Sequence, residues 1–348
     1  MENVKEKKKM KLWQKLTIIF SSIIVGIGVI LGGAIAYFRL PVNEYYKNSE
    51  KAFIIPALST AYVPQGFCYD ADSGWFLATG YMKDGTASPI YAVDKNSGKT
   101  VKTVYLKLEN GSDYTGHCGG ITFWNDYVYI ADGGEHCLYI FDYAQFKAAE
   151  NGSDLKSIGK FMTETENGDY VKPSCVEVNG DKIVIGEFFR EPKYKTFNTH
   201  KITTPNGDKN TALAVEFALD LTYTSTFGIN PVPEKAYSMR EQVQGMTFDG
   251  NKVYLSTSWG VSFSHIFFYD TSAASSATMT VLETEIPVYY LDRASLVKDI
   301  KAPPMSEEMA IVNGKLYVLS ESASTKYIFG KFTGGKWCYA TYLSKYGL

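Results

Sequence analysis

The sequence predicts an all-β fold, a β-propeller of five four-stranded blades preceded by one N-terminal transmembrane helix. Two observations predict it: a hairpin pattern that occurs five times, and a long uncharged apolar segment near the N-terminus. Each copy of the pattern has a small or polar pair, an apolar residue, and two alternating runs joined by an Asn, Asp or Gly turn. The copies are residues 65–77, 119–130, 174–185, 244–255 and 307–318.

The turns and the following segments set the size of each repeat. Tight hairpin turns need positive φ, which three dipeptides accept readily: Asn179-Gly180, Asp249-Gly250 and Asn313-Gly314. A second strand segment follows most copies, at residues 90–94, 138–142, 266–270 and 327–331. Each unit therefore has about four strands. One such sheet cannot bury both of its faces alone, so we expect the units to pack face to face in a ring.

The N-terminal region predicts a membrane anchor. Residues 1–15 are a basic tail, residues 16–38 carry no charge, and Arg39 ends the apolar segment. This segment exceeds the ~20 residues needed to cross a bilayer as a helix. Lysines before the span predict a cytoplasmic N-terminus and an extracytoplasmic propeller. A cleaved signal peptide, with residues 34–36 as its small-residue site, is the alternative. Its apolar region is normally only ~7–15 residues long, which favours an uncleaved signal-anchor.

After the anchor, residues 39–62 are expected to form a stalk and residues 63–348 the propeller. Two segments are candidates for the strand that closes the ring, residues 53–58 and residues 339–343. Residues 190–211 and 223–239 contain prolines and lack a clear period, so we predict long surface loops there. Residues 286–291 are expected to be the outer strand of blade four, followed by a linker with Pro303-Pro304.

Composition narrows the classes of partner. The formal net charge is −2, which gives no reason to expect nucleic acid. The five cysteines occupy unrelated positions in the repeats, and no CxxC or Cys/His pattern with zinc spacing is present. We therefore favour buried, unpaired cysteines over a disulfide framework.

Polar side chains are expected to gather at one mouth of the central channel. In a propeller, the loops before each inner strand and the loops joining the second and third strands share that mouth. Arg side chains there can pair a carboxylate or phosphate, and a Trp can stack on a ring. The predicted ligand-binding residues are Gln65, Tyr81, His117, Arg190, Arg240, Gln244, Trp259, Glu308 and Glu321. For Gln65 and Gln244, hydrogen bonding to neighbouring inner-strand backbone is an equal alternative.

Catalytic and metal-binding roles have fewer candidates. A general base could be His117, Glu187 or Glu308. Glu308 and Glu321 could contribute oxygen ligands to calcium. Glu307 and Glu308 are adjacent on a strand and point to opposite faces, so only one of them can serve a given site. No complete catalytic constellation can be assembled from these residues.

Blade one carries a family resemblance. Its segments 64–67, 78–81, 90–94 and 97–99 resemble the first blade of the plant-type glutaminyl cyclotransferase propellers. The resemblance implies a five-bladed fold and a related pocket around Gln65. That family's catalytic glutamate precedes a glycine at the start of blade two, and Gly119 stands at the matching position. The chain is also similar, more distantly, to gluconolactonase and regucalcin propellers, but Gln65, Gly119 and Ser174 do not reproduce their metal ligands.

The leading hypothesis is a membrane-anchored extracytoplasmic propeller that binds a polar small molecule, a peptide or a protein at its channel mouth without catalysis. The first alternative is an enzyme, either a hydrolase or a glutaminyl-cyclotransferase-like protein, that uses mouth carboxylates or His117. The second alternative is an interaction scaffold that recruits partners through exposed blade edges or residues 190–211.

Overall fold

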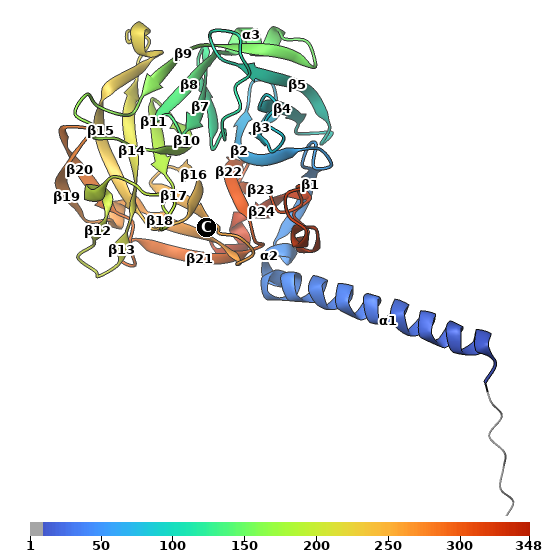
Figure 1. Cartoon of the computed structure of the whole chain (residues 1–348). Coiled ribbons are helices and arrows are strands. Elements are labelled where there is room, and N and C mark those ends of the chain that lie inside the picture. Colours follow the sequence, from blue (N-terminus) through green and yellow to red (C-terminus); the bar gives the residue numbers. More distant parts are fainter. Residues whose placement is uncertain (1–9) are drawn as a thin grey trace, which may run out of the picture.

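A computed structural model describes residues 10–348 and places one long helix beside a ring of sheets (Figure 1). Helix α1 (Leu12–Arg39) continues through η1 (Leu40–Val42) and α2 (Asn43–Lys47) into the propeller. Within the described residues, this is the one helical segment long and apolar enough to cross a membrane. The predicted span, residues 16–38, lies inside α1. Residues 1–9 of the predicted basic tail lie outside the described residues.

The strands of residues 10–348 form a five-bladed propeller, as the repeats predict, with four strands in each blade and an additional hairpin on blade three. Blade one is β2 (Tyr62–Asp70), β3 (Trp75–Met82), β4 (Pro89–Asp94) and β5 (Thr100–Lys107). Blade two is β6 (Ile121–Trp124), β7 (Tyr127–Asp132), β8 (Cys137–Asp142) and β9 (Ser153–Met162). Blade three is β10 (Pro173–Asn179), β11 (Lys182–Glu187), β14 (Ala212–Leu219) and β15 (Ile229–Met239). Blade four is β16 (Val243–Asp249), β17 (Lys252–Thr257), β18 (Ser264–Asp270) and β21 (Leu296–Ala302). Blade five is β22 (Ser306–Val312), β23 (Lys315–Ser320), β24 (Trp337–Tyr342) and β1 (Ser49–Ile54).

The first strand of each hairpin copy lines the hub. Strands β2, β6, β10, β16 and β22 contact one another around the ring. One apolar residue of each copy is fully buried there: Phe67, Ile121, Val176, Met246 and Met309. Apolar clusters fill each gap between neighbouring blades. Both faces of every sheet are thereby removed from water, which explains why a ring is required.

The ring closes through the chain segment that precedes blade one. Strand β1 pairs antiparallel with β24, from Ser49 opposite Thr341 to Ile54 opposite Trp337. Phe53 is buried and packs against Phe67 and Phe76 of blade one. The two segments considered for closure are therefore neighbours in one sheet, with β24 third from the hub and β1 outermost.

Blade five departs from the pattern expected for its third strand. Residues 327–331 are not a strand: they run through a turn into η5 (Phe329–Thr333). Ile328 is 80% exposed and Phe329 is 58% exposed, so these apolar side chains do not pack in a sheet. The prediction was wrong because an apolar run next to a polar turn resembles a strand whether or not it is buried.

The region between blades three and four corrects two further expectations. Residues 229–239 form β15 despite Pro231 and Pro233, and the register of β15 shifts near Pro233. Residues 286–290 lie in β20 (Thr284–Tyr290), which pairs with β19 (Ser276–Val281) and runs parallel to β15. This hairpin therefore extends blade three. The fourth strand of blade four is β21, in the stretch expected to be a linker.

The insertion at residues 190–211 is mostly irregular, with η2 (Asn198–His200) and a short hairpin of β12 (Ile202–Thr203) and β13 (Lys209–Asn210). The remaining helical turns lie on the periphery: α3 (Tyr143–Ala148), η3 (Thr224–Thr226), η4 (Thr271–Ala273) and η6 (Leu343–Tyr346). All five cysteines are buried and unpaired, which confirms the expectation from their spacing.

Candidate functional site

A cavity of about 680 Å³ opens at one mouth of the central channel. Its lining comes from loops of different blades. Five of the residues predicted to bind a ligand line it: Gln65, His117, Gln244, Trp259 and Glu321. A sixth, Tyr81, packs on His117 just behind the lining. The wall of the cavity has an aromatic side and a charged side.

The aromatic side is built from Phe188, Tyr194 and Trp259. Phe188 and Tyr194 follow β11, and Trp259 follows β17. The ring centroid of Phe188 lies 5.3 Å from that of Tyr194 and 6.1 Å from that of Trp259. The Arg190 guanidinium lies 5.5 Å from the Trp259 ring on the outside of this cluster. These rings offer a rigid apolar surface to a ligand.

The charged side is centred on Glu321, which follows β23 and is largely buried. The hydroxyl of Tyr327 donates to Glu321 Oε1 at 2.6 Å, and Gln65 Nε2 donates to Oε2 at 3.2 Å. Lys326 Nζ lies 3.9 Å from Oε2. Burial raises the pKa of Glu321, while Lys326, Tyr327 and Gln65 oppose that rise.

Glu307 is a second buried carboxyl next to this group. Burial raises its pKa well above the ordinary range, and the negative charge of Glu321 raises it further. Its Oε1 is buried without a hydrogen-bond partner within the described part of the chain. Two like charges so close cannot both be stable, so the pair holds one proton more readily than two separate carboxylates would.

Glu308 points the other way, into the hub, as alternation along β22 predicts. Its Oε1 accepts a 2.9 Å hydrogen bond from the Met246 backbone N–H. It is fully buried, and burial raises its pKa well above the usual range. Gly120 and Gly245 make room for it, since a Cβ at either position would lie 2.9 Å from one of its carboxylate oxygens. Glu308 fills the hub and does not line the cavity.

His117 and Tyr81 form the rim beside Glu321. Their ring centroids are 4.2 Å apart, and Lys326 Nζ donates to the Tyr81 hydroxyl. The His117 ring reaches solvent, yet protein surrounds it on most sides of the concave mouth. This loss of hydration, together with the charge of Lys326, lowers the pKa of His117 to about 4.

Three predicted residues have other surroundings. Arg240 stacks on Phe267, with its guanidinium 3.7 Å from the ring centroid, and does not line the cavity. Arg190 lies 3.6 Å from Glu241 behind Trp259. Glu187 is fully buried and accepts hydrogen bonds from the Lys172 and Leu213 backbone N–H groups, with His200 Nδ1 2.8 Å from its Oε2. Because Glu187 belongs to β11 and His200 to the 190–211 insertion, this contact holds the insertion against blade three.

The sequence did not single out Phe188, Tyr194, Lys326 or Tyr327 for this site. Tyr327 was missed because residues 327–331 were assigned to a strand, and Lys326 directly precedes that segment. Phe188 directly follows the alternating run of β11, at the position where a mouth loop begins, and this was the available signal.

Glu308 and Glu321, the residues predicted to bind calcium, do not share a site. Glu308 lies in the hub and Glu321 at the mouth, each with its own partners. Among residues 10–348, no group of three or more His, Cys, Asp or Glu side chains is arranged to hold a metal ion. Calcium binding would need additional oxygen ligands.

Gly119, which the resemblance in blade one matches to the catalytic glutamate of the glutaminyl cyclotransferases, lines the cavity. A Cβ there would overlap the carbonyl oxygen of Ser174. A larger side chain at this position would therefore require the backbone of blade three to move. The glycine is a packing requirement of this chain.

Comparison with known proteins gives likeness of fold only. No protein-family model and no curated protein matches the chain. Similar solved structures include a glutaminyl cyclase of Myxococcus xanthus, at 9% identity over 84% of this chain and 94% of that one, with a TM-score of 0.42. A PQQ-bound aldose sugar dehydrogenase from Streptomyces coelicolor has 12% identity over 84% and 95%, with a TM-score of 0.44. BamB from Moraxella catarrhalis has 8% identity over 74% and 82%, with a TM-score of 0.32. A glutaminyl cyclase is thus among the similar propellers, as the resemblance in blade one implied, and these likenesses assign no activity.

Proposed function

We propose that this protein is a membrane-anchored propeller that binds a small polar molecule or the end of a peptide at its channel mouth. The observation that carries the proposal is one cavity lined both by the aromatic rings of Phe188, Tyr194 and Trp259 and by the Glu321 hydrogen-bond group. A ligand with one flat or apolar face and several hydroxyl or amino groups fits both walls. Sugars and peptide N-termini have this chemistry.

The size of the cavity supports a small ligand. Pockets for small molecules commonly have volumes of about 300–1,000 Å³, with apolar walls and a few fixed polar groups. The cavity here has about 680 Å³. Gln65 and Tyr327 fix the Glu321 carboxylate by hydrogen bonds, so little side-chain entropy is lost when a ligand binds to it.

The anchor supports a position at the cell surface. Helix α1 is apolar along its length, and the lysines that precede residue 16 favour a cytoplasmic N-terminus. The propeller would then lie outside the cytoplasm, where it meets extracellular solutes and peptides.

A ligand screen on the full-length protein in mild detergent tests the proposal. Sugars, peptides with a free N-terminus, nucleotides and calcium would each be added, and thermal unfolding followed. We expect stabilisation by one class, because a ligand that binds the native state raises its stability. Glu321→Gln and Trp259→Ala should each remove that stabilisation, since they alter the polar and the aromatic parts of the cavity lining.

The matched control is Glu234→Gln, which makes the same chemical change on the outer strand of blade three. Glu234 is exposed and pairs with Lys182 at 2.8 Å, far from the cavity. It should respond to the ligand like the unaltered protein. Stabilisation that survives both cavity variants would place the ligand elsewhere and refute the proposal.

A second candidate function is acid–base catalysis, which the carboxyl pair Glu307 and Glu321 favours. Raised pKa values beside a cavity are common at catalytic sites, because a protonated carboxyl near neutral pH can donate and take back a proton. Glu321 reaches the cavity and Glu307 lies behind it, so Glu321 is the candidate acid.

The resemblance of blade one to the glutaminyl cyclotransferase propellers supplies the first substrate to test. Peptides with an N-terminal glutamine would be incubated with the protein, and loss of ammonia on cyclisation followed by mass spectrometry. Turnover that Glu321→Gln abolishes and Glu234→Gln leaves intact would establish an enzyme. Peptide binding without turnover would support the binding function.

A further inference from the structure

A second cavity lies where α1 meets the propeller. It has a volume of about 370 Å³ and is separate from the channel mouth. Four cationic side chains and two aromatic side chains supply most of its lining: Arg39, Lys51, Lys331, Lys336, Trp337 and Tyr339. These residues come from the end of α1, from β1, from η5, and from β24 and the residue that precedes it.

The charge of this cavity is not neutralised by carboxylates of residues 10–348. No acidic side chain of that part of the chain lines it. Within the described residues, no carboxylate lies within ion-pair distance of Lys51, Lys331 or Lys336. The nearest acidic residue in sequence, Glu50, pairs with Lys315 at 2.7 Å. Four cations with no counter-charge repel one another, so an anion that enters gains from all four.

The aromatic residues shape the floor. Lys51 Nζ lies 5.5 Å and Lys336 Nζ 5.7 Å from the Trp337 ring centroid. The two ammonium groups therefore lie near the same ring, although the lysines belong to different segments of the chain. Arg39 Nε donates to the Phe332 carbonyl at 3.0 Å, which fixes the guanidinium at the edge of the cavity.

The position of Arg39 along the chain sets the height of this cavity relative to a bilayer. Residues 16–38 are uncharged, and as a helix they span about 34 Å, compared with about 30 Å of hydrocarbon. Arg39 is the first charge after this span and so lies at the level of the lipid headgroups. The cavity that Arg39 lines lies at the same level.

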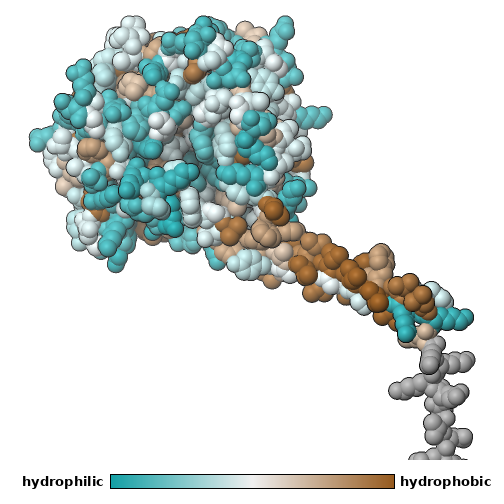
Figure 2. All heavy atoms as spheres, in the orientation of Figure 1, coloured by the Kyte–Doolittle hydropathy of each residue, from teal (hydrophilic) through white to brown (hydrophobic). Residues whose placement is uncertain are grey.

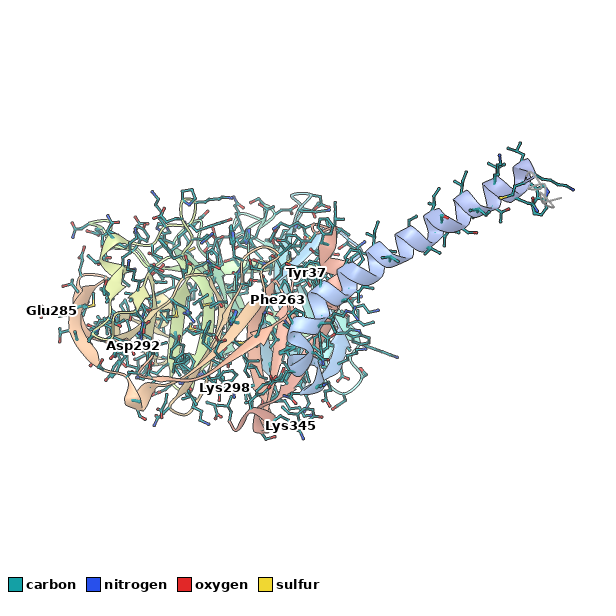
Figure 3. The ribbon with its side chains drawn as sticks, turned by 90° about the horizontal axis from the view of Figure 1, so that it is seen from below. Tyr37, Phe263, Glu285, Asp292, Lys298 and Lys345 are labelled. Atoms are coloured by element: carbon teal, nitrogen blue, oxygen red, sulfur yellow. The ribbon has the colours of Figure 1, made fainter. Side chains whose placement is uncertain are left out.

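The surroundings have the composition of a membrane-surface contact. The Tyr37 ring, within the span, lies 6.3 Å from the Phe263 ring of the β17–β18 loop (Figure 3). Leu40, Ile328 and Phe329 are 69%, 80% and 58% exposed. In Figure 2 the apolar surface of α1 continues onto the propeller where the helix joins it. Exposed apolar side chains beside lysines favour the bilayer interface.

We propose that this cavity binds the phosphate headgroup of an anionic phospholipid. The phosphate would accept hydrogen bonds from Arg39 and the lysines, while the acyl chains lie along α1 and against Ile328 and Phe329. Basic clusters immediately beside a membrane span attract anionic lipids in this way. Such a lipid would fix the angle between the propeller and the membrane. The proposal rests on α1 spanning the bilayer, and it is independent of what the channel mouth binds.

The test uses full-length protein in neutral detergent, stripped of lipid. Phosphatidylglycerol or phosphatidylcholine is added, and retained lipid is counted by native mass spectrometry while thermal unfolding is followed. We expect phosphatidylglycerol to be retained and to stabilise the protein, and phosphatidylcholine to do neither. Lys331→Gln/Lys336→Gln should weaken phosphatidylglycerol binding about tenfold or more, because two headgroup contacts lose their charge.

The control variant Lys156→Gln/Lys209→Gln removes two exposed lysines, Lys156 from blade two and Lys209 from the insertion in blade three. It makes the same change in net charge and should bind phosphatidylglycerol like the unaltered protein. Both pairs of lysines are exposed, so both variants should fold. Equal retention of the two lipids, or unchanged binding by Lys331→Gln/Lys336→Gln, would overturn the proposal.

Two further arms separate the possible causes of failure. Inorganic phosphate and glycerol 3-phosphate are tested in place of lipid, and stabilisation equal to that by phosphatidylglycerol would assign the cavity to a soluble phosphate compound and overturn the lipid site. Alkaline extraction of membranes that contain the protein tests the anchor directly. Release of the protein into the supernatant would show that α1 is not inserted and would remove the basis of the proposal.

Discussion

The Tyr81 ring stacks on the His117 ring, with centroids 4.2 Å apart and an angle of 28° between their planes. The Tyr81 hydroxyl also accepts a hydrogen bond from Lys326. Three segments far apart in the sequence therefore meet at one point of the rim: the end of β3, the start of blade two and the β23–β24 connection. Loss of hydration, together with the cationic Lys326 held beside the ring, lowers the pKa of His117 and keeps the imidazole neutral.

We predict that His117 titrates well below an ordinary histidine, at a pKa of about 4. A depressed histidine pKa adds stability above the unfolded-state value of 6.5, and that stability is lost as the pH falls toward 4. The measurement is a proton NMR titration of the histidine ring signals, with His117→Gln to assign the resonance. Lys326→Met should raise the His117 pKa by removing the positive charge. A midpoint near 6.5 in the unaltered protein would contradict the prediction.

The hub carboxyl Glu308 should make the protein less stable as the pH rises. Its folded-state pKa is raised by burial, so its contribution is fully present below the unfolded-state value of about 4.5 and is lost as the pH rises through the folded-state value. One proton gives a slope of at most about 1.4 kcal/mol per pH unit. Glu308→Gln removes this ionisation, so we expect its stability relative to the unaltered protein to increase with pH above 4.5.

Urea unfolding at several pH values, followed by circular dichroism, measures this difference. Glu177 is also buried, with its pKa raised to about 8, and its charge helps to raise the pKa of Glu308, so the difference between the two proteins reports on Glu308 together with its coupling to Glu177. Glu234→Gln, on the outer strand β15, is the control and should follow the unaltered protein at every pH. A constant difference between Glu308→Gln and the unaltered protein over this range would show that Glu308 is not held protonated.

Gly120→Ala is expected to destabilise the propeller through the contact between blades two and three. A Cβ at residue 120 would lie 2.5 Å from the Val176 backbone nitrogen and 2.8 Å from the Cys175 Cα. Backbone atoms of β10 cannot rotate away, so the strand must shift at a cost of about 1–3 kcal/mol. Gly134→Ala is the comparison, since the one atom its Cβ would approach is Asp132 Oδ1, at 3.0 Å. If chemical denaturation gives equal losses for the two variants, the hub is less tightly packed than described.

Two adjacent residues of β1 test how the ring closes. Phe53 is 2% exposed between blades five and one, whereas Ile54 is 52% exposed. We expect Phe53→Ala to lower the free energy of unfolding by about 3–5 kcal/mol and Ile54→Ala by less than about 0.5 kcal/mol. Both changes lie in the same strand and differ in the face that the side chain occupies. Similar small losses from both in urea titrations would mean that β1 does not close the ring in solution.

The sequence predicted the inner part of each blade more accurately than the outer part. The hairpin turns at Gly180, Gly250 and Gly314 all have positive φ, as tight turns require. The outer strands were harder to predict, because β15 contains two prolines and β20 joins a blade other than the one its position suggests. Pro231 and Pro233 lie in the part of β15 that pairs with β14 alone, since β20 pairs only with residues 236–238, and backbone without a second neighbour tolerates proline.

The residues of the candidate site were also predicted only in part. Gln65, His117, Gln244, Trp259 and Glu321 could be assigned to the mouth because their places in the repeat fix which end of a strand they follow. Arg190 and Arg240 occupy similar places, but their guanidinium groups pack on the Trp259 and Phe267 rings, and neither residue lines the cavity. A repeat specifies the end of a blade, and the direction of a long side chain depends on its neighbours in space.

By itself, the sequence determined the number of blades, their inner strands and the presence of one long apolar helix, because each follows from periodicity and turn chemistry over a few residues. The tertiary structure alone decided which carboxyl enters the hub, which residues meet at the mouth, and that four cations gather where α1 ends. Those arrangements join residues from opposite ends of the chain, such as Arg39 and Lys336, whose proximity arises only when β1 pairs with β24.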